Sequence, residues 1–122
     1  MPKITVTTPK LPEGMPEKLA RALQDAAYPI IQNREIYTYI NEPRYFVNGE
    51  EQFDGYINLE VNGPQLDDQT RGALCKALFD VCKELLGERR TLFGYSSTPL
   101  NQIGINGLLM PEYKKAKAEG RL

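Results

Sequence analysis

The alternation of apolar and polar residues predicts four strands and two helices. The period of two indicates strands over 3–8, 35–41, 56–61 and 91–96, and helical spacing indicates helices over 16–28 and 67–86. Pro29 should end or bend the first helix, and Asp67 or Asp68 and then Gly87 should bound the second. The order is therefore strand–helix–strand, twice.

The segments outside these elements carry weaker signals. Residues 42–54 read as a loop or loose hairpin around the turn pair Asn48-Gly49. Residues 103–106 suit a short edge strand, and the tail after Pro111 suits a solvated helix turn or a frayed end.

The two halves of the chain also share sequence. Residues 4–6 match residues 57–59, and residues 9–11 match residues 64–66. We expect an α+β fold in which two fused βαβ units form a four-stranded sheet with both helices on one face. Residues 1–122 then make one domain, with pseudo-repeats 1–45 and 55–110. The bare, polar sheet face should be covered by other subunits.

Composition excludes several function classes. The formal net charge is −1, which offers no electrostatic attraction for nucleic acid or an anionic membrane. No apolar run spans a bilayer and no signal peptide precedes Ile4, so we expect a cytoplasmic protein. The chain has no histidine, which excludes histidine acid–base chemistry, serine triads and histidine metal ligation. Cys75 and Cys82 suit buried core thiols, and we expect neither a metal nor a cofactor.

Pro2 is the candidate reactive residue. Methionine is normally removed before proline, which would leave a secondary amine at the start of the first strand. An α-amino group has a pKa of about 8. Desolvation or a nearby cation lowers that pKa, so the amine can act as a base or nucleophile near neutral pH.

These features together resemble the tautomerase superfamily, above all its macrophage migration inhibitory factor-like branch, over residues 1–110. The resemblance rests on Met1-Pro2, the duplicated unit, the strand end at 59–63 and the stretch Gln102-Ile103-Gly104-Ile105-Asn106-Gly107. The segment 42–49 also resembles the loop after the second strand of 4-oxalocrotonate tautomerase-like proteins.

The resemblance implies a homotrimer whose sheets form a barrel, with a site at each subunit interface. Pro2 would be the general base of keto–enol chemistry on a small anionic carbonyl substrate. The implied pocket residues are Lys3 and Asn62, Tyr95 or Ser96 from the neighbouring subunit, and an apolar wall of Ile103 and Ile105.

This chain departs from the family's pattern at three binding positions. Arg34 is the nearest cation to the place of the inhibitory factor's lysine, Tyr37 stands where the oxalocrotonate branch has an arginine, and Ile105 replaces an aromatic residue. The resemblance favours a tautomerase acting on a small 2-oxo carboxylate. One alternative is a proline-based decarboxylase or dehalogenase using Arg89, Arg90 and Glu112. Another is a non-catalytic trimer that binds a ligand or protein.

Overall fold

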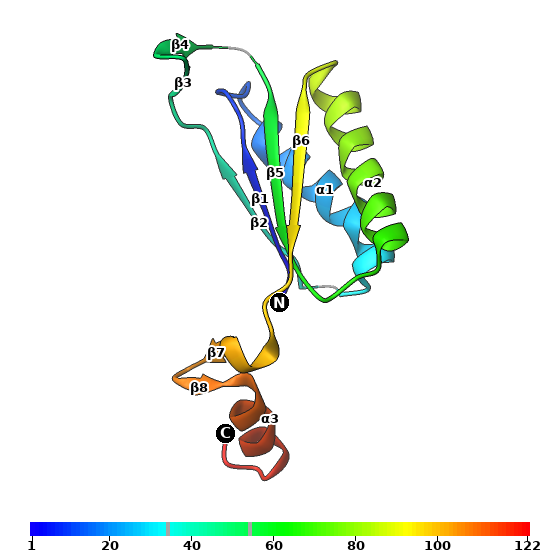
Figure 1. The fold of residues 1–122 in the computed structure, drawn as a ribbon, viewed down its shortest axis with the longest axis vertical. Helices are drawn as coiled ribbons and strands as arrows, with labels where there is room; N and C mark the ends of the chain where they lie inside the picture. The colour runs from blue at the N-terminus through cyan, green and yellow to red at the C-terminus, as the bar shows by residue number, and fades with distance from the viewer. Residues whose placement is uncertain (34, 54) are drawn as a thin grey trace.

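The computed structural model describes residues 1–33, 35–53 and 55–122 and has an α+β fold (Figure 1). The first half contains β1 (Lys3–Thr7), α1 (Met15–Ile31), β2 (Tyr37–Asn41), β3 (Tyr45–Val47) and β4 (Glu50–Gln52). The second half contains β5 (Ile57–Asn62), α2 (Asp68–Leu86), β6 (Thr91–Ser96), the 3-10 helix η1 (Leu100–Gln102), β7 (Gly104–Ile105), β8 (Leu108–Leu109) and α3 (Met110–Ala118).

The central sheet has the strand order β2-β1-β5-β6. β1 pairs parallel with β2, β5 pairs parallel with β6, and the two halves join through the antiparallel pair β1–β5. Both α1 and α2 lie on the same face of the sheet (Figure 1). The expected fold of two βαβ units with their helices on one face is therefore confirmed.

The core lies between this sheet and the two helices. Alternate residues of β1 and β5 point into it, because successive side chains of a strand face opposite ways. Its fully buried side chains from the strands and helices are Ile4, Val6, Leu19, Leu23, Ala27, Ile57, Leu59, Val61, Leu74, Leu78 and Cys82. The other residues of the same strands face away from the helices.

The helix boundaries confirm one expectation and correct another. The Asp67 carboxylate accepts a hydrogen bond from the Thr70 backbone N–H at 2.7 Å and caps α2, which ends at Gly87 as predicted. The expectation that Pro29 ends or bends α1 near Tyr28 was wrong about the end, because α1 continues to Ile31. A proline within the last turn removes few hydrogen bonds, and the Gln32 N–H still bonds to the Tyr28 carbonyl at 2.7 Å.

Residues 45–52 form a real hairpin beyond the end of β2. Asn48 and Gly49 both have positive φ, at 52° and 82°, which is the turn that Asn-Gly favours. Arg44 and Glu51 make a two-bond ion pair beside it, at 2.9 and 2.7 Å. This hairpin lies at the end of the sheet opposite the N-terminus (Figure 1).

Residues 97–122 form what we call the C-terminal arm. The arm leaves β6 beside the N-terminus and extends away from the sheet (Figure 1). β7 and β8 pair antiparallel within it, and α3 packs against them and η1 with Ala116 buried. The tail expected to be a helix turn or frayed end is thus a nine-residue helix.

The sheet face away from the helices is bare in the single chain. Tyr37, Tyr39 and Leu92 on this face are 38%, 50% and 41% exposed. In the arm, Leu100 and Leu109 are exposed as well. Across the described ranges, no helix has the length and apolar character needed to cross a membrane.

Candidate functional site

A row of four polar side chains crosses the bare face at the N-terminal end of the sheet. Lys3 pairs with Tyr37 of β2 on one side and with Asn62 of β5 on the other, and Asn62 pairs with Ser96 of β6. Neighbouring strands lie about 5 Å apart, so adjacent members of the row are within reach of one ligand. The order across the sheet is Tyr37–Lys3–Asn62–Ser96. Its member on β1, Lys3, directly follows Pro2 in the sequence.

Pro2 itself is buried beneath this end of the sheet. Its carbonyl accepts a hydrogen bond from the Tyr37 N–H at 3.0 Å, which fixes the backbone on which the ring sits. Gly63 packs beside it: a Cβ there would lie 3.8 Å from the Pro2 Cβ and 2.8 Å from the Tyr95 hydroxyl. A side chain at residue 63 would therefore displace the Tyr95 hydroxyl and would touch the proline ring.

Two cavities meet around Met1 and Pro2. The smaller one, about 270 Å³, contains Pro2 and is bounded by the end of α1, by Gly63 and by the arm residues Leu100 and Ile103. The larger one, about 400 Å³, opens on the bare face; its lining residues are Met1, Lys3, Tyr37, Tyr39, Asn62, Thr98, Gln102 and Ile103. The two cavities adjoin beside the N-terminus, since both are lined by Met1, Asn62, Thr98 and Ile103.

The charge next to Pro2 is positive. The Lys3 ammonium is exposed and has no hydrogen-bond or ion-pair partner among the described residues. Tyr37 differs, because its hydroxyl donates to the Glu35 carboxylate at 2.6 Å, and this bond together with the Glu35 charge raises the pKa of Tyr37. Lys3 is therefore free to bind an anion, whereas the Tyr37 proton is already engaged.

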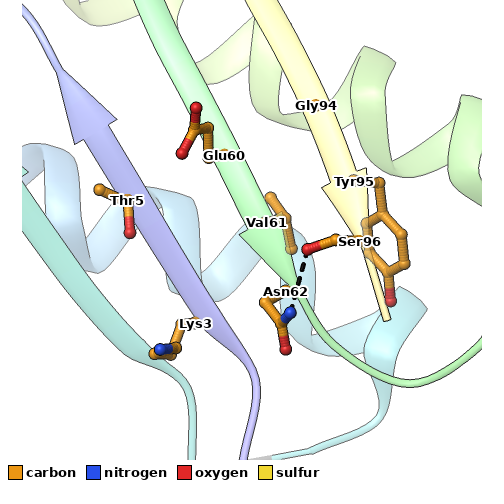
Figure 2. A pocket seen from close by; sticks show the side chains of 8 residues that line it. All are labelled: Lys3, Thr5, Glu60, Val61, Asn62, Gly94, Tyr95 and Ser96. Atoms are coloured by element: carbon orange, nitrogen blue, oxygen red, sulfur yellow. Dashed lines mark hydrogen bonds between the residues drawn. The ribbon is translucent and has the colours of Figure 1, made fainter. Parts of the chain in front are cut away.

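Asn62 is held in place by two hydroxyl groups. Its Nδ2 lies 3.0 Å from Ser96 Oγ and 3.0 Å from Thr98 Oγ1. These bonds tie the end of β5 to the end of β6 and to the segment that enters the arm. Figure 2 shows the bond to Ser96, with Lys3 on the neighbouring strand.

A third cavity, of about 360 Å³, lies next to Asn62 on the same face (Figure 2). It lies over the second row of the sheet, in which Thr5 pairs with Glu60 and Glu60 pairs with Gly94. Because Gly94 has no side chain, the space beside Glu60 stays open. Lys3 and Asn62 line this cavity as well as the larger one.

The structure separates two of the predicted site residues from the row. The Tyr95 ring lies on the helix-facing side of β6, where it stacks on Phe93 with the centroids 6.5 Å apart and its hydroxyl donates to the Pro64 carbonyl, although the residue also lines the third cavity. Ile105 lies in β7 of the arm and lines neither cavity at Pro2. Within one chain, Ser96 is the β6 residue of the row, and Ile103 is one of the apolar residues that line the cavity at Pro2.

The other expectations have mixed outcomes. Arg34 lies outside the described residues. Arg89 and Arg90 precede β6 at the end of the sheet opposite Pro2, and Glu112 lies in α3; none of the three lines the cavities described above. The cations of the decarboxylase or dehalogenase alternative are thus remote from Pro2 within one chain.

Sequence reasoning missed three residues that line the larger cavity: Tyr39, Thr98 and Gln102. Tyr39 lies two residues after Tyr37 in β2 and therefore faces the same side of the sheet. Thr98 and Gln102 follow β6 in an irregular segment with no periodicity, and nothing local indicates that the chain returns to Pro2. Within the described ranges, no three His, Cys, Asp or Glu residues cluster so as to hold a metal ion.

The sequence matches no protein-family model, and no curated protein is significantly similar to it. The fold is similar to several solved structures. Native fused 4-OT has a TM-score of 0.79 at 15% identity, over 92% of this chain and 98% of that one. Another fused 4-OT structure, described as an asymmetric trimer, has the same TM-score at 15% identity, over 91% and 98% of the two chains.

Two further structures have the same arrangement. Pt0534, described as inactivated by 2-oxo-3-pentynoate, has a TM-score of 0.76 at 18% identity, over 91% of this chain and 98% of that one. The macrophage migration inhibitory factor of Toxoplasma gondii has a TM-score of 0.72 at 12% identity, over 88% and 98%. The chain therefore has the fold of the tautomerase superfamily, in the form that carries two βαβ units on one polypeptide.

Proposed function

We propose that this chain, after loss of Met1, is a tautomerase that uses the amine of Pro2 as a general base on a small 2-oxo carboxylate. The observation that carries the proposal is that the buried Pro2, which lines the smaller cavity, directly precedes Lys3, which lines the larger one and whose ammonium has no partner among the described residues. The cavity volumes suit a small carboxylate, and they approach the usual range for ligand sites.

The surroundings of Pro2 favour a neutral amine. Burial disfavours the charged form, and the full positive charge of Lys3 on the next residue disfavours it further. The C-terminal turn of α1 acts the other way, since Ile31 and Gln32 line the proline cavity and a helix C-terminus has about half a negative charge. We expect the two lowering effects to outweigh the partial charge of the helix end and to hold the pKa of the Pro2 amine below the ordinary value of about 8.

The proposed reaction divides between two residues. The substrate carboxylate pairs with the Lys3 ammonium, which places the keto group at carbon 2 and the hydrogen-bearing carbon 3 near the proline nitrogen. Pro2 then removes a proton from carbon, or from the enol oxygen in the reverse direction, and returns it at the other position. The positive charge of Lys3 also stabilises the enolate that forms in between.

Assembly completes the proposed site. The exposed tyrosines of the bare face and the exposed leucines of the arm form apolar surface that a second copy would cover. A fused 4-OT structure with this fold is a trimer. We propose that this chain is also a homotrimer, in which Tyr95 or Ser96 of one copy contributes to the site of a neighbouring copy.

Two measurements on one sample test the function. Protein of confirmed mass, lacking Met1, should convert the enol form of phenylpyruvate to the keto form, and 2-oxo-3-pentynoate should add once and map to Pro2. The matched control is the same chain with an N-terminal Gly-Ser extension, in which the Pro2 nitrogen is an amide. Equal activity or equal labelling in the extended chain would rule out the proline mechanism.

A further inference from the structure

The orientation of the Asn62 side-chain amide has a consequence for ligand choice. Both protons on its nitrogen are used, on Ser96 Oγ and Thr98 Oγ1. Its carbonyl oxygen accepts no hydrogen bond from the residues that the structure describes. The amide therefore presents a free acceptor, not a donor, to the cavities that it lines.

Lys3 favours the same orientation from the other side. It is the cross-strand neighbour of Asn62 on the same face, and its ammonium has no partner in the described ranges. A cation attracts the amide oxygen and repels the amide NH₂ group. With the nitrogen bonded to the two hydroxyls, the amide oxygen is left on the side that the Lys3 charge favours.

We propose that Asn62 is a specificity-determining residue that selects carboxylates bearing a hydroxyl on the adjacent carbon, as in a 2-hydroxy acid or an enol acid. The inference rests on the proposed function for the location of the carboxylate on Lys3. With the carboxylate there, the substituent on the next carbon lies beside Asn62 Oδ1. A hydroxyl can donate a hydrogen bond to that oxygen. A keto oxygen cannot, because both oxygens are acceptors and repel each other.

The preference has a direction. The enol form of a 2-oxo acid carries the donor that Asn62 requires, and the keto form lacks it. The free site therefore binds the enol acid more tightly than the keto acid. Ser96 and Thr98 are the positioning residues, because without their hydroxyls the amide can turn its nitrogen toward the ligand.

The test compares two ligands of nearly the same shape, 2-hydroxybutanoate and 2-fluorobutanoate. Both are carboxylates at neutral pH, but fluorine cannot donate a hydrogen bond. Dissociation constants are measured by NMR titration on the full-length protein lacking Met1. A net hydrogen bond to a neutral acceptor predicts tighter binding of the hydroxy acid by about 3- to 10-fold.

The variant Ser96→Ala/Thr98→Val keeps Asn62 and Lys3 but releases the amide. We expect the ratio of the two dissociation constants to fall toward one, while Lys3→Gln weakens both ligands and leaves the ratio unchanged. If the double variant does not fold, each single variant should lower the ratio part of the way. A wild-type ratio near one, a ratio unchanged in the Ser96 and Thr98 variants, or no binding of either ligand overturns the inference.

The same data separate this inference from the proposed function. If the hydroxy acid binds more tightly as predicted but the protein has no proline-dependent turnover, the proposed tautomerase function is wrong and the role of Asn62 in ligand selection stands. If turnover depends on Pro2 but the two dissociation constants are equal, the proposed tautomerase function stands and the role of Asn62 is wrong.

Discussion

Replacing Lys3 by glutamine should weaken the use of an anionic substrate without unfolding the protein. Lys3 is exposed and has no partner in the described part of the chain, so its loss should change the free energy of unfolding by less than about 0.5 kcal/mol. Two unit charges about 4 Å apart interact by about 1 kcal/mol in water and about 4 kcal/mol near a protein surface. A charged hydrogen bond is worth about 1.5–3 kcal/mol net, within the same range.

We take about 1.5–2.5 kcal/mol as the contribution of Lys3, which corresponds to a loss of about 10- to 70-fold in kcat/KM. Most of the loss should appear in KM, because the carboxylate is bound in both the ground state and the transition state. The assay is ketonisation of enol-phenylpyruvate followed by ultraviolet absorbance. Lys3→Arg, which keeps the charge, and Lys10→Gln, which removes an exposed lysine beyond the other end of β1, are the controls.

Salt provides a second readout of the same interaction. Raising the ionic strength should raise KM for the wild-type protein, since an exposed charge pair is screened, and should have little effect on Lys3→Gln. A Lys3→Gln variant within twofold of wild type, with the same response to salt, would contradict the assignment of the carboxylate to Lys3.

Three further predictions concern the fold and its ionisable groups. Asp67→Ala should lower the free energy of unfolding in urea by about 1 kcal/mol through loss of the cap on Thr70, and Asp67→Asn should largely retain it. The same bond to Thr70 lowers the pKa of Asp67, so its contribution is present above the unfolded pKa and is lost as the pH falls through the folded one. Burial raises the pKa of Cys82 to about 11, so iodoacetamide at pH 8 should leave Cys82 unmodified in the native protein and label it in urea, as read by mass spectrometry. Glu35→Gln should lower the pKa of Tyr37, followed by tyrosinate absorbance, because its hydroxyl loses a charged acceptor; an unchanged titration would show that the bond is not formed in solution.

Much of the fold was predictable because each half obeys simple local rules. The residues of β1 and β5 alternate strictly between the core and the bare face, and Asp67 and Gly87 bound α2 as such residues commonly do. The prediction from Pro29 was wrong because the effect of a proline depends on its position. Near the end of a helix it removes few backbone hydrogen bonds. The C-terminal arm was underestimated, since α3 gains its stability from packing on β7 and β8 and shows little periodicity of its own.

The candidate site was only partly predictable, because it depends on strand register and on returning segments. Pro2 follows from its chain position, whereas Lys3, Asn62 and Ser96 were implied by the family resemblance and lie together because the strand register aligns them. Thr98 reaches Asn62 through a segment without regular structure, and local sequence does not specify that approach. The choice between Tyr95 and Ser96 depends on the strand register, because adjacent residues of β6 face opposite sides of the sheet, toward the core and toward the bare face.

The most direct test of the central claim is an NMR titration of the Pro2 nitrogen in ¹⁵N-proline-labelled protein whose mass confirms the loss of Met1. Burial and the Lys3 charge predict a pKa below the ordinary value of about 8, rising toward it in Lys3→Gln. A Pro2 pKa at or above the ordinary value, unmoved by Lys3→Gln, would contradict the account of Pro2 as a base held neutral by its surroundings.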